Sequence, residues 1–355
     1  MGDARVPRGL PAGVTRVTVV TGGTTPERNV AFAGAAQVVA ALREAGYTVT
    51  VVDTASGEMS PTAEARYLAP TVGTHPPSLE ELRALAASEL GATLVEIPVV
   101  RDADLVLPVL HGRQGEGGEL QALLDSAGIT YVGSGVLGSA LAMDKDIAKR
   151  LFRTAGVPTP DWATWPAGPT EVAGLGLPLV VKPVKAGSTV GLTVVRLLDD
   201  VEAAIATAHE YDDEVMFEAY LDGPEYTVGI LADRALAVGE IIPQHEIFDY
   251  ECKYTPGMTE EIFPARISDE RAARLQALAL AVHRSLKLRD FSRVDFRMGA
   301  DGTAHCLEAN TLPGLTATSL LPQSAAAAGI GFTELCDTIC RLALARSGPR
   351  NKVQP

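Results

Sequence analysis

The chain has 355 residues, 46% of them hydrophobic and 21% charged, with a formal net charge of −14. This length can bury a large core and suggests two or three domains. The acidic balance, without a cluster of Lys and Arg, argues against nucleic acids and anionic membranes as partners, since both bind basic surfaces. No apolar run reaches the roughly 18 residues of a membrane span. The start of the chain lacks the apolar core of a secretory signal.

The first part of the chain alternates strands and helices, which is typical of an α/β fold with a doubly wound parallel sheet. The strand RVTVVTGG (16–23) leads into an alanine-rich helix (29–45) and the strand YTVTVVD (47–53). Residues 54–78 are rich in Pro, Ser, Thr and Gly, which predicts a surface excursion. The remaining predicted elements are a helix at 78–89, a strand at 103–110 and a helix at 117–127. Because the sequence changes character after TYVGSG, we expect this domain to span residues 15–133.

Two α+β units are predicted to follow, over residues 134–222 and 223–347. The first has a helix at 144–155, strands at 178–183 and 191–197, a helix at 199–209 and a strand at 214–221. The second has strands at 224–231 and 235–242, an irregular segment at 243–262, a helix at 269–287, a hairpin at 291–309 and a helix at 332–345. The four cysteines form no CxxC pair, so we expect reduced structural thiols in a cytoplasmic protein.

The hairpin places polar residues where a core strand would be apolar. The turn former GADG separates FSRVDFRM from TAHCLEAN. If the loop has four residues, Met298 opposes Thr303, and residues in opposed positions share a face. One face then carries the polar residues Arg293, Asp295, Glu308 and Asn310, and the other carries the apolar residues Val294, Phe296, Leu307 and Ala309. Oxygen donors this close suit Mg²⁺, whereas the alternative is a solvated face with a salt bridge to Arg293. A bulge in the turn would reverse this parity.

Three further segments have polar residues in suggestive positions, each with a plainer alternative. KPVKAGSTVG (182–191) could cradle phosphate with its turn N–H groups and Lys182, or be an ordinary hairpin turn. His111 follows the carboxyl end of a strand, where α/β sites lie, although a structural role is equally open. FDYECKY (248–254) lies in the long irregular segment, which is either a lid or a solvated loop.

Taken in chain order, the motifs resemble those of the D-alanine–D-alanine ligases of the ATP-grasp superfamily, from about residue 16 to residue 345. The matching blocks are GGTTPERNV, HGRQGEGGELQ, YVGSGVLGSALAMDK, VKPVKAGSTVGL, FEAYLDGPEYTV, FDYECKY, RVDF and LEANTLPGLTATSLLP. The resemblance implies an ATP-grasp fold, in which the α/β domain is followed by two α+β domains that sandwich ATP. It also implies a reaction in two steps for peptidoglycan precursor synthesis. ATP phosphorylates the carboxylate of one D-alanine, and the amine of a second D-alanine attacks the acyl phosphate.

The same resemblance implies a role for each residue that matches a family motif. The residues implied for two Mg²⁺ ions, which Mn²⁺ can replace, are Asp295, Glu308 and Asn310. Those implied for ATP are Lys145, Lys182 and Lys253 at the phosphates and Glu218 and Glu225 at the adenine and ribose. Those implied for stabilising oxyanions are Arg293 and the N–H of Gly314.

The amino-acid sites are implied in the same way. The residues implied for the first D-alanine are Glu27 and His111, and those for the carboxylate of the second are Ser319 and Leu320. The family's triad between the first domain and the lid would be Glu27, Ser188 and Tyr254, and a tyrosine at the last position goes with peptide rather than ester formation. Family analogy also implies a homodimer.

Some positions depart from the family pattern and leave the second substrate open. They are Thr25, Ala31, Gly117, Ala219, Leu312 and Thr318. The alternative is therefore an ATP-grasp ligase that joins D-serine, D-lactate or another amino acid. A regulatory nucleotide-binding protein is disfavoured because no metal or oxyanion residue is lost. A nicotinamide dehydrogenase is disfavoured because TGGTTPERN lacks GxGxxG.

Overall fold

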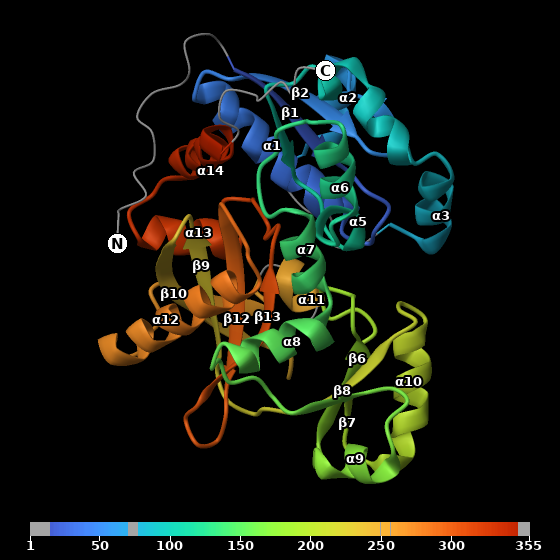
Figure 1. The fold of residues 1–355 in the computed structure, drawn as a ribbon, viewed down its shortest axis with the longest axis vertical. Coiled ribbons are helices and arrows are strands. Elements are labelled where there is room, and N and C mark those ends of the chain that lie inside the picture. The colour runs from blue at the N-terminus through green and yellow to red at the C-terminus, as the bar shows by residue number, and fades with distance from the viewer. Residues whose placement is uncertain (1–14, 70–76, 249, 256, 347–355) are drawn as a thin grey trace, which may run out of the picture.

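The computed structural model describes residues 15–69, 77–248, 250–255 and 257–346. Three sheets follow one another along the chain. In Figure 1 the first lies at the top, the third below it, and the second at the lower right. The fold is the predicted α/β arrangement, with one largely parallel sheet followed by two antiparallel ones. Within the described residues, no helix is long and apolar enough to cross a membrane.

The first sheet has the order β3-β2-β1-β4. The strands β1 (Arg16–Thr21), β2 (Thr48–Asp53) and β4 (Leu105–Pro108) are parallel, and β3 (Gly57–Glu58) runs antiparallel at the edge. Helix α1 (Arg28–Glu44) packs against α14 (Phe332–Arg346), so an element from each end of the chain shares one core. The opposite face is covered by a second cluster that includes Leu120 and Leu124 of α6 (Glu119–Ser126).

The segment predicted as a surface excursion is partly regular. It contains β3 and the helix α2 (Pro61–Tyr67), which begins with Ser60 accepting a hydrogen bond from the N–H of Ala63 and with Pro61 at its first position. These are typical start signals of a helix, which the Pro and Ser content concealed. The other short helices of this part are α3 (Leu79–Ala87), η1 (Gly91–Glu96), α4 (Pro98–Arg101) and α5 (Arg113–Glu116).

The second sheet has the order β5-β8-β6-β7. Its strands are β5 (Trp162–Thr164), β6 (Leu179–Pro183), β7 (Thr193–Val195) and β8 (Val215–Ala219), and β5 was not predicted. The neighbouring helices are α9 (Pro169–Gly174), η2 (Leu198–Asp200) and α10 (Val201–His209). Leu179 and Val181 point into a core with α10, whereas Val180 and Lys182 face the opposite side. This alternation gives β6 one structural face and one face free for a ligand.

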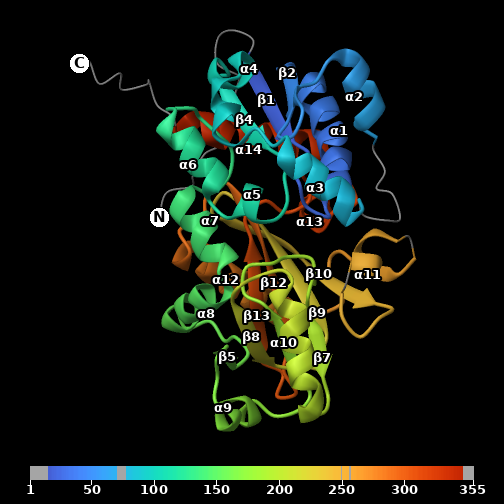
Figure 2. The same cartoon turned by 90° about the vertical axis from the view of Figure 1, so that its right-hand side faces the viewer.

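The third sheet has the order β11-β10-β9-β12-β13. Its strands are β9 (Glu225–Leu231), β10 (Arg234–Pro243), β11 (Thr259–Ile262), β12 (Phe291–Met298) and β13 (Ala304–Asn310). The helices α7 (Val136–Met143), α8 (Lys145–Thr154) and α12 (Asp269–Ser285) cover one face of it, and α13 (Leu320–Ala327) packs on β9 and β10. The segment predicted to be irregular contains β11 and the short helix α11 (Tyr250–Tyr254), which stands at the side of this sheet in Figure 2.

The register of the hairpin β12–β13 differs from the prediction. Met298 pairs with Ala304 instead of Thr303, so the loop is one residue longer. The register then shifts between Phe296, which pairs with Cys306, and Asp295, which pairs with Glu308. Leu307 is the extra residue of this bulge, and a bulge of one residue restores the parity that the longer loop had reversed.

The longer loop and the bulge offset each other only between the bulge and the end of the hairpin away from the turn. Arg293 pairs with Asn310 and Asp295 with Glu308, so the polar residues share a face as predicted. The prediction that Leu307 belongs to the core is wrong, because its side chain lines a cavity between the second and third sheets. Cys306 takes the core position instead and is fully buried.

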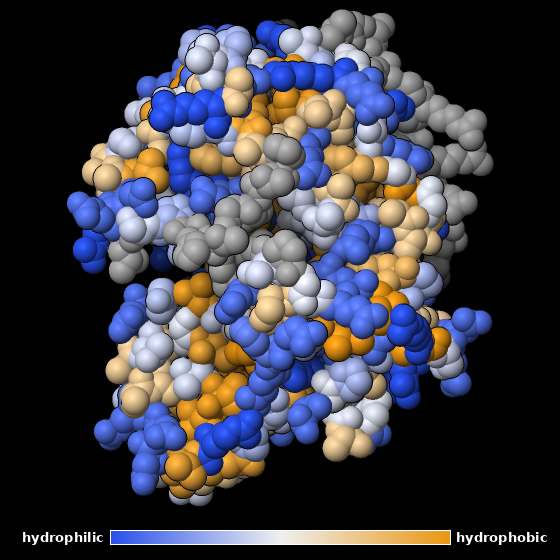
Figure 3. All heavy atoms as spheres, turned by 180° about the vertical axis from the view of Figure 1, so that it is seen from behind, coloured by the Kyte–Doolittle hydropathy of each residue, from blue (hydrophilic) through white to orange (hydrophobic). Residues whose placement is uncertain are grey.

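The second sheet packs on a core of its own with α10, whereas one core of the first unit continues into the third. The shared cluster joins α1 and β1 to α14 and to Phe291 of β12. In the view from behind, the lower end of the molecule shows the largest hydrophobic area (Figure 3). Exposed apolar side chains of the second unit include Trp165, Leu177, Leu197 and Leu198. None of the four cysteines, all in described segments, forms a disulfide.

Candidate active site

Two adjoining cavities lie between the three sheets. The first, here called the nucleotide cavity, lies between the second and third sheets, and its predicted site residues are Lys145, Lys182, Glu218, Glu225, Lys253, Arg293, Asp295 and Glu308. The second, here called the amino-acid cavity, lies between the first and third units, and its predicted site residues are Glu27, His111, Ser188, Lys253, Arg293, Asn310, Gly314, Ser319 and Leu320. Lys253 and Arg293 line both cavities. The helix α11 includes Tyr254, but the side chain of Tyr254 lies outside the described part of the structure.

The third sheet aims a compact acidic group into the nucleotide cavity. Asp295 accepts hydrogen bonds from Arg293 Nη2 at 2.8 Å, Asn310 Nδ2 at 2.9 Å and Thr227 Oγ1 at 2.7 Å. Its cross-strand partner Glu308 forms an ion pair with Lys145 at 3.2 Å. Burial opposes ionisation of Glu308, but Lys145, Lys253 and Lys182 together hold its pKa at about 2. Two carboxylates and a carboxamide on paired strands are hard oxygen donors that fit a Mg²⁺ ion.

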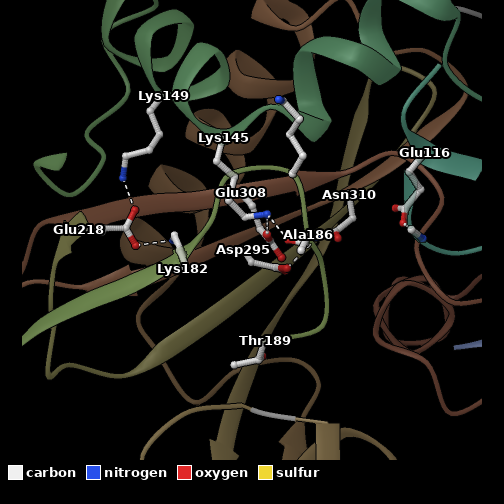
Figure 4. A network of polar contacts seen from close by, with 12 residues as sticks. Glu116, Lys145, Lys149, Lys182, Ala186, Thr189, Glu218, Asp295, Glu308 and Asn310 are labelled. Carbon is white, nitrogen blue, oxygen red and sulfur yellow. Dashed lines mark hydrogen bonds and ion pairs between the residues drawn. The ribbon is translucent and has the colours of Figure 1, made fainter. Parts of the chain in front are cut away.

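The cations that face this group come from three different elements. Asp144 caps α8 by accepting from the N–H of Ile147 at 3.0 Å, which places Lys145 at the first helical position. The Lys145 ammonium also donates to the carbonyl of Ala186 at 2.7 Å. Lys182 extends from β6, and Lys253 comes from α11, with its ammonium 5.2 Å from the ring centroid of Phe248. Figure 4 shows Lys182 beside Glu218 and Lys145 beside Glu308.

The turn between β6 and β7 bridges all three units. Ser188 and Thr189 have φ angles of 52° and 63°, in the left-handed region that is unfavourable for residues other than glycine. Ser188 donates a hydrogen bond to Glu27 in the first unit. Thr189 Oγ1 donates to the carbonyl of Phe248 at 2.9 Å in the segment before α11. The two bonds hold the turn over the junction of the cavities, where strain of this kind is often found.

The amino-acid cavity combines an acidic end and an end made of hydroxyl and backbone groups. Burial lowers the pKa of His111, although Glu27 opposes this shift, and the lowered pKa favours the neutral imidazole. Ser319 Oγ lies 2.7 Å from Thr316 Oγ1 and accepts from the N–H of Thr316 at 3.2 Å. Ser319 is also the N-cap of α13, so Leu320, which lines the cavity, is the first residue of a helix. The start of a helix favours an anion such as a carboxylate.

The sequence reasoning missed two residues that line the amino-acid cavity, Glu116 and Glu261, and one that lies behind the nucleotide cavity, Lys149. Glu116 lies in the quoted block HGRQGEGGELQ and accepts from the N–H of Gly112 at 2.9 Å, and burial together with the charge of Glu27 raises its pKa to about 8. Lys149, four residues after Lys145, lies on the same side of α8 and binds Glu218, a contact that its helical spacing could have suggested. Glu261 lies on β11 and accepts from the amide of Gln323. No signal marked Glu261, because β11 itself was not predicted.

Of the departures from the family pattern, Leu312 and Thr318 line the amino-acid cavity. Leu312 is 3% exposed and packs in the core shared by the first and third units, so its apolar side chain is explained by burial. Thr318 lines the cavity, and its carbonyl accepts from Gln323 at 2.7 Å. Ala31 is fully buried in α1, and Ala219 lines the nucleotide cavity.

Comparison with known proteins covers both parts of this site. A family model described as the N-terminus of D-ala D-ala ligase matches residues 16–134, and one described as its C-terminus matches residues 151–341. The chain belongs to the D-alanine–D-alanine ligase family. The D-alanine–D-alanine ligase of Desulfotalea psychrophila is 40% identical over 94% of this chain and 96% of that protein. That of Syntrophobacter fumaroxidans is 40% identical over 92% of this chain and 97% of that protein.

Solved structures of the family extend the likeness to the fold. The Bacillus anthracis D-alanine–D-alanine ligase complexed with ATP has a TM-score of 0.75 and 31% identity, covering 94% of this chain and 98% of that one. The VanG D-Ala:D-Ser ligase of Enterococcus faecalis has a TM-score of 0.75 and 29% identity, covering 93% of this chain and 100% of that one. The fold is therefore the ATP-grasp fold expected from the motifs.

Proposed function

We propose that this ligase joins two D-alanines to D-alanyl-D-alanine with conversion of ATP to ADP and phosphate, for peptidoglycan precursor synthesis. One observation supports this most. The residues that match the family motifs come from all three units and line two cavities that meet at Lys253 and Arg293. A nucleotide in one cavity can therefore react with an amino acid in the other.

In the first step, the carboxylate of the first D-alanine attacks the γ-phosphorus of ATP and the bond to the β–γ bridging oxygen breaks. The protein contributes position and charge more than covalent chemistry. Lys145, Lys182 and Lys253 balance the phosphate charge, and the turn at Ser188 covers the phosphates. Asp295, Glu308 and Asn310 would hold the Mg²⁺ ions, which neutralise charge on the phosphate oxygens when bound.

In the second step, the amine of the second D-alanine attacks the acyl phosphate and phosphate leaves from the tetrahedral intermediate. Arg293 and the N–H of Gly314 donate to the developing oxyanion, where preorganised donors have most effect. Glu27 receives the ammonium of the first D-alanine, beside His111, whose lowered pKa favours the neutral imidazole. Ser319 and the start of α13 at Leu320 receive the carboxylate of the second. Tyr254, with Glu27 and Ser188, would complete the link to the lid.

The ATP site has adenine and ribose ends in this proposal. Glu218 and Glu225 lie on β8 and β9 at the part of the nucleotide cavity away from the amino-acid cavity. Burial and the charge of Asp295 raise the pKa of Glu225 to about 7. A carboxyl group that is half ionised near neutral pH can accept hydrogen bonds from ribose hydroxyls.

A ligase that uses D-serine as second substrate is the competing function. It is favoured by the similarity to the VanG D-Ala:D-Ser ligase and by the departures at Leu312 and Thr318. The test is phosphate release and product identification with ATP, Mg²⁺ and a panel of D-alanine, D-serine, D-lactate and L-amino acids. Fastest turnover with D-alanine alone supports the proposal, whereas brisk turnover that does not require D-alanine refutes it.

Three further features belong to the proposal. The protein acts in the cytoplasm, where ATP and D-alanine are available. It forms a homodimer, which sedimentation would reveal. Its domains span residues 15–133, 134–222 and 223–347, in keeping with one sheet in each.

A further inference from the structure

A fully buried lysine lies behind the nucleotide cavity. The side chain of Lys149 is 0% exposed, and its ammonium forms an ion pair with Glu218. The ammonium also lies 5.1 Å from the ring centroid of Trp162, whose indole N–H is fixed by a 2.7 Å hydrogen bond to Asp146. Burying a lysine is costly unless it is paired. The described lining of the nucleotide cavity includes Glu218 and Lys182 but not Lys149, so Lys149 acts through its neighbours.

Glu218 is shared by two lysines, one on each oxygen. Lys182 donates to Oε1 at 2.6 Å, and Lys149 donates to Oε2 from the opposite side, as Figure 4 shows. Burial disfavours the Glu218 carboxylate, but the two ammonium groups hold its pKa at about 2. One carboxylate between two ammonium groups leaves a net charge of +1. Without Lys149, the carboxylate would neutralise Lys182, and the pair would offer no net charge to a triphosphate.

We propose that Lys149 is a positioning residue that keeps Glu218 paired, so that Lys182 can turn its ammonium from Glu218 to the ATP phosphates. When Lys182 turns away, Glu218 still has Lys149 as its partner. In the absence of Lys149, the same movement would leave a buried carboxylate unpaired, which is strongly unfavourable. Lys149 therefore lowers the free-energy cost of binding a triphosphate without touching it. The inference rests on the proposed role of Lys182 at the phosphates.

The location of Lys149 on α8 supports this assignment. Ala148 and Phe152 of the same helix pack in the core of the third unit, while Lys149 reaches across to Glu218 in the second sheet. Lys145, one helical turn earlier, contacts Glu308. One helix thus carries two lysines that pair with carboxylates of different sheets, and only the first of them lines the cavity.

The test compares ATP with adenosine, because adenosine has no phosphates. Dissociation constants are measured by calorimetry for the wild-type protein and for Lys149→Met, which keeps the length of the side chain. We expect Lys149→Met to weaken ATP binding about tenfold or more, equivalent to about 1.4 kcal/mol, and to change adenosine binding less than about twofold. An equal loss for both ligands, or no loss for ATP, would overturn the inference. Arg150→Met on the same helix is the matched control, because Arg150 pairs with Asp146 instead of Glu218, lines neither the nucleotide cavity nor the amino-acid cavity, and should leave both affinities unchanged.

A double-mutant cycle with Glu218 gives a second readout, the change in ATP affinity, which would not depend on Glu218 if the role of Lys149 were purely structural. In Glu218→Gln there is no carboxylate to neutralise Lys182, so adding Lys149→Met should cause no further loss of ATP affinity. The same loss in both backgrounds would contradict the proposal. If Lys149→Met alone does not fold, Glu218→Gln is still compared with the double variant, from which the ion pair is removed altogether, and a further loss of ATP affinity in the double variant would contradict the proposal.

Lys182→Met separates this inference from the proposed function. If it leaves ATP binding intact, the assignment of the phosphate site fails. If it weakens ATP binding while Lys149→Met does not, only the role of Lys149 fails.

Discussion

Asp295 and Glu308 face each other across β12 and β13, and a bulge at Leu307 makes this possible. On the turn side of the bulge, the hairpin keeps the register of Phe296 with Cys306, in which both side chains belong to the core. On the other side, the shifted register brings two carboxylates together. Bulges of this kind re-aim side chains near active sites. The acidic pair is thus built by a local irregularity of the strand.

Replacement of Glu308 tests the metal site. Glu308→Gln keeps the size of the side chain but removes a carboxylate whose pKa is held at about 2, despite burial, by Lys145, Lys253 and Lys182. We expect ATP-dependent ligation to fall by about 100-fold or more, the size typical of losing one preorganised charged group. Phosphate release with ATP, Mg²⁺ and D-alanine measures it. Circular dichroism should show an unchanged fold, and a variant with wild-type turnover would show that the metal assignment is wrong.

Replacement of Gly314 tests the second-substrate end of the amino-acid cavity. A Cβ atom at this position would lie 2.7 Å from Ser319 Oγ. Ser319 would have to rotate and give up its hydrogen bonds with Thr316. We therefore expect Gly314→Ala to raise the KM for the second D-alanine about tenfold, equivalent to about 1.4 kcal/mol, and to leave the KM for ATP unchanged.

The control for this variant is Gly331→Ala, because a Cβ atom at Gly331 meets no heavy atom within 4 Å. Gly331→Ala should keep wild-type KM values for both substrates. A Gly314→Ala enzyme with an unaltered KM for D-alanine would remove Ser319 from the proposed carboxylate site.

The gathering of residues such as Lys182, Asp295 and Asn310 at one site was predictable from the order of the motifs, because short polar motifs are local in the chain, and these residues line the two cavities. The contacts that hold them were not predictable, and their roles as ligands stay a prediction. The partners Lys149 and Glu261 were missed, since their roles depend on packing between units. Parity arguments could not give the register of the hairpin, because neither the longer turn nor the bulge has a signature in GADG or in CLEAN. The helix α2 and the strands β5 and β11 were hidden by short length and polar composition.

Tyr254 is predicted to bear on the choice between peptide and ester. By the family resemblance, a tyrosine at this position of the lid goes with dipeptide formation. We expect Tyr254→Phe to raise the use of D-lactate relative to D-alanine as second substrate. Competition between the two, scored by chromatography of the products, measures the ratio. An unchanged ratio would refute this role for Tyr254, and Tyr67→Phe, a change at an exposed tyrosine of α2, is the matched control.

Glu116 should make the stability of the ligand-free protein depend on pH. Burial, followed by the charge of Glu27, raises its pKa from the ordinary value of 4.5 to about 8. A carboxyl group with a raised folded-state pKa binds its proton more tightly when folded. Its contribution to the free energy of unfolding is therefore complete below pH 4.5 and is lost as the pH rises to about 8. Glu116→Gln mimics the protonated form and can still accept from the N–H of Gly112.

Glu116→Gln should consequently be as stable as the wild type near pH 5 and more stable than the wild type at pH 9. We expect a difference of about 1 kcal/mol at pH 9, less than complete burial would give, because the carboxyl group lines an open cavity. Melting curves of both proteins at several pH values measure it. Because Glu225 also has a raised pKa and is present in both proteins, the difference between them isolates Glu116. Parallel melting temperatures from pH 5 to pH 9 would show that Glu116 is ionised in the folded protein at neutral pH, with Arg293 as its counter-charge.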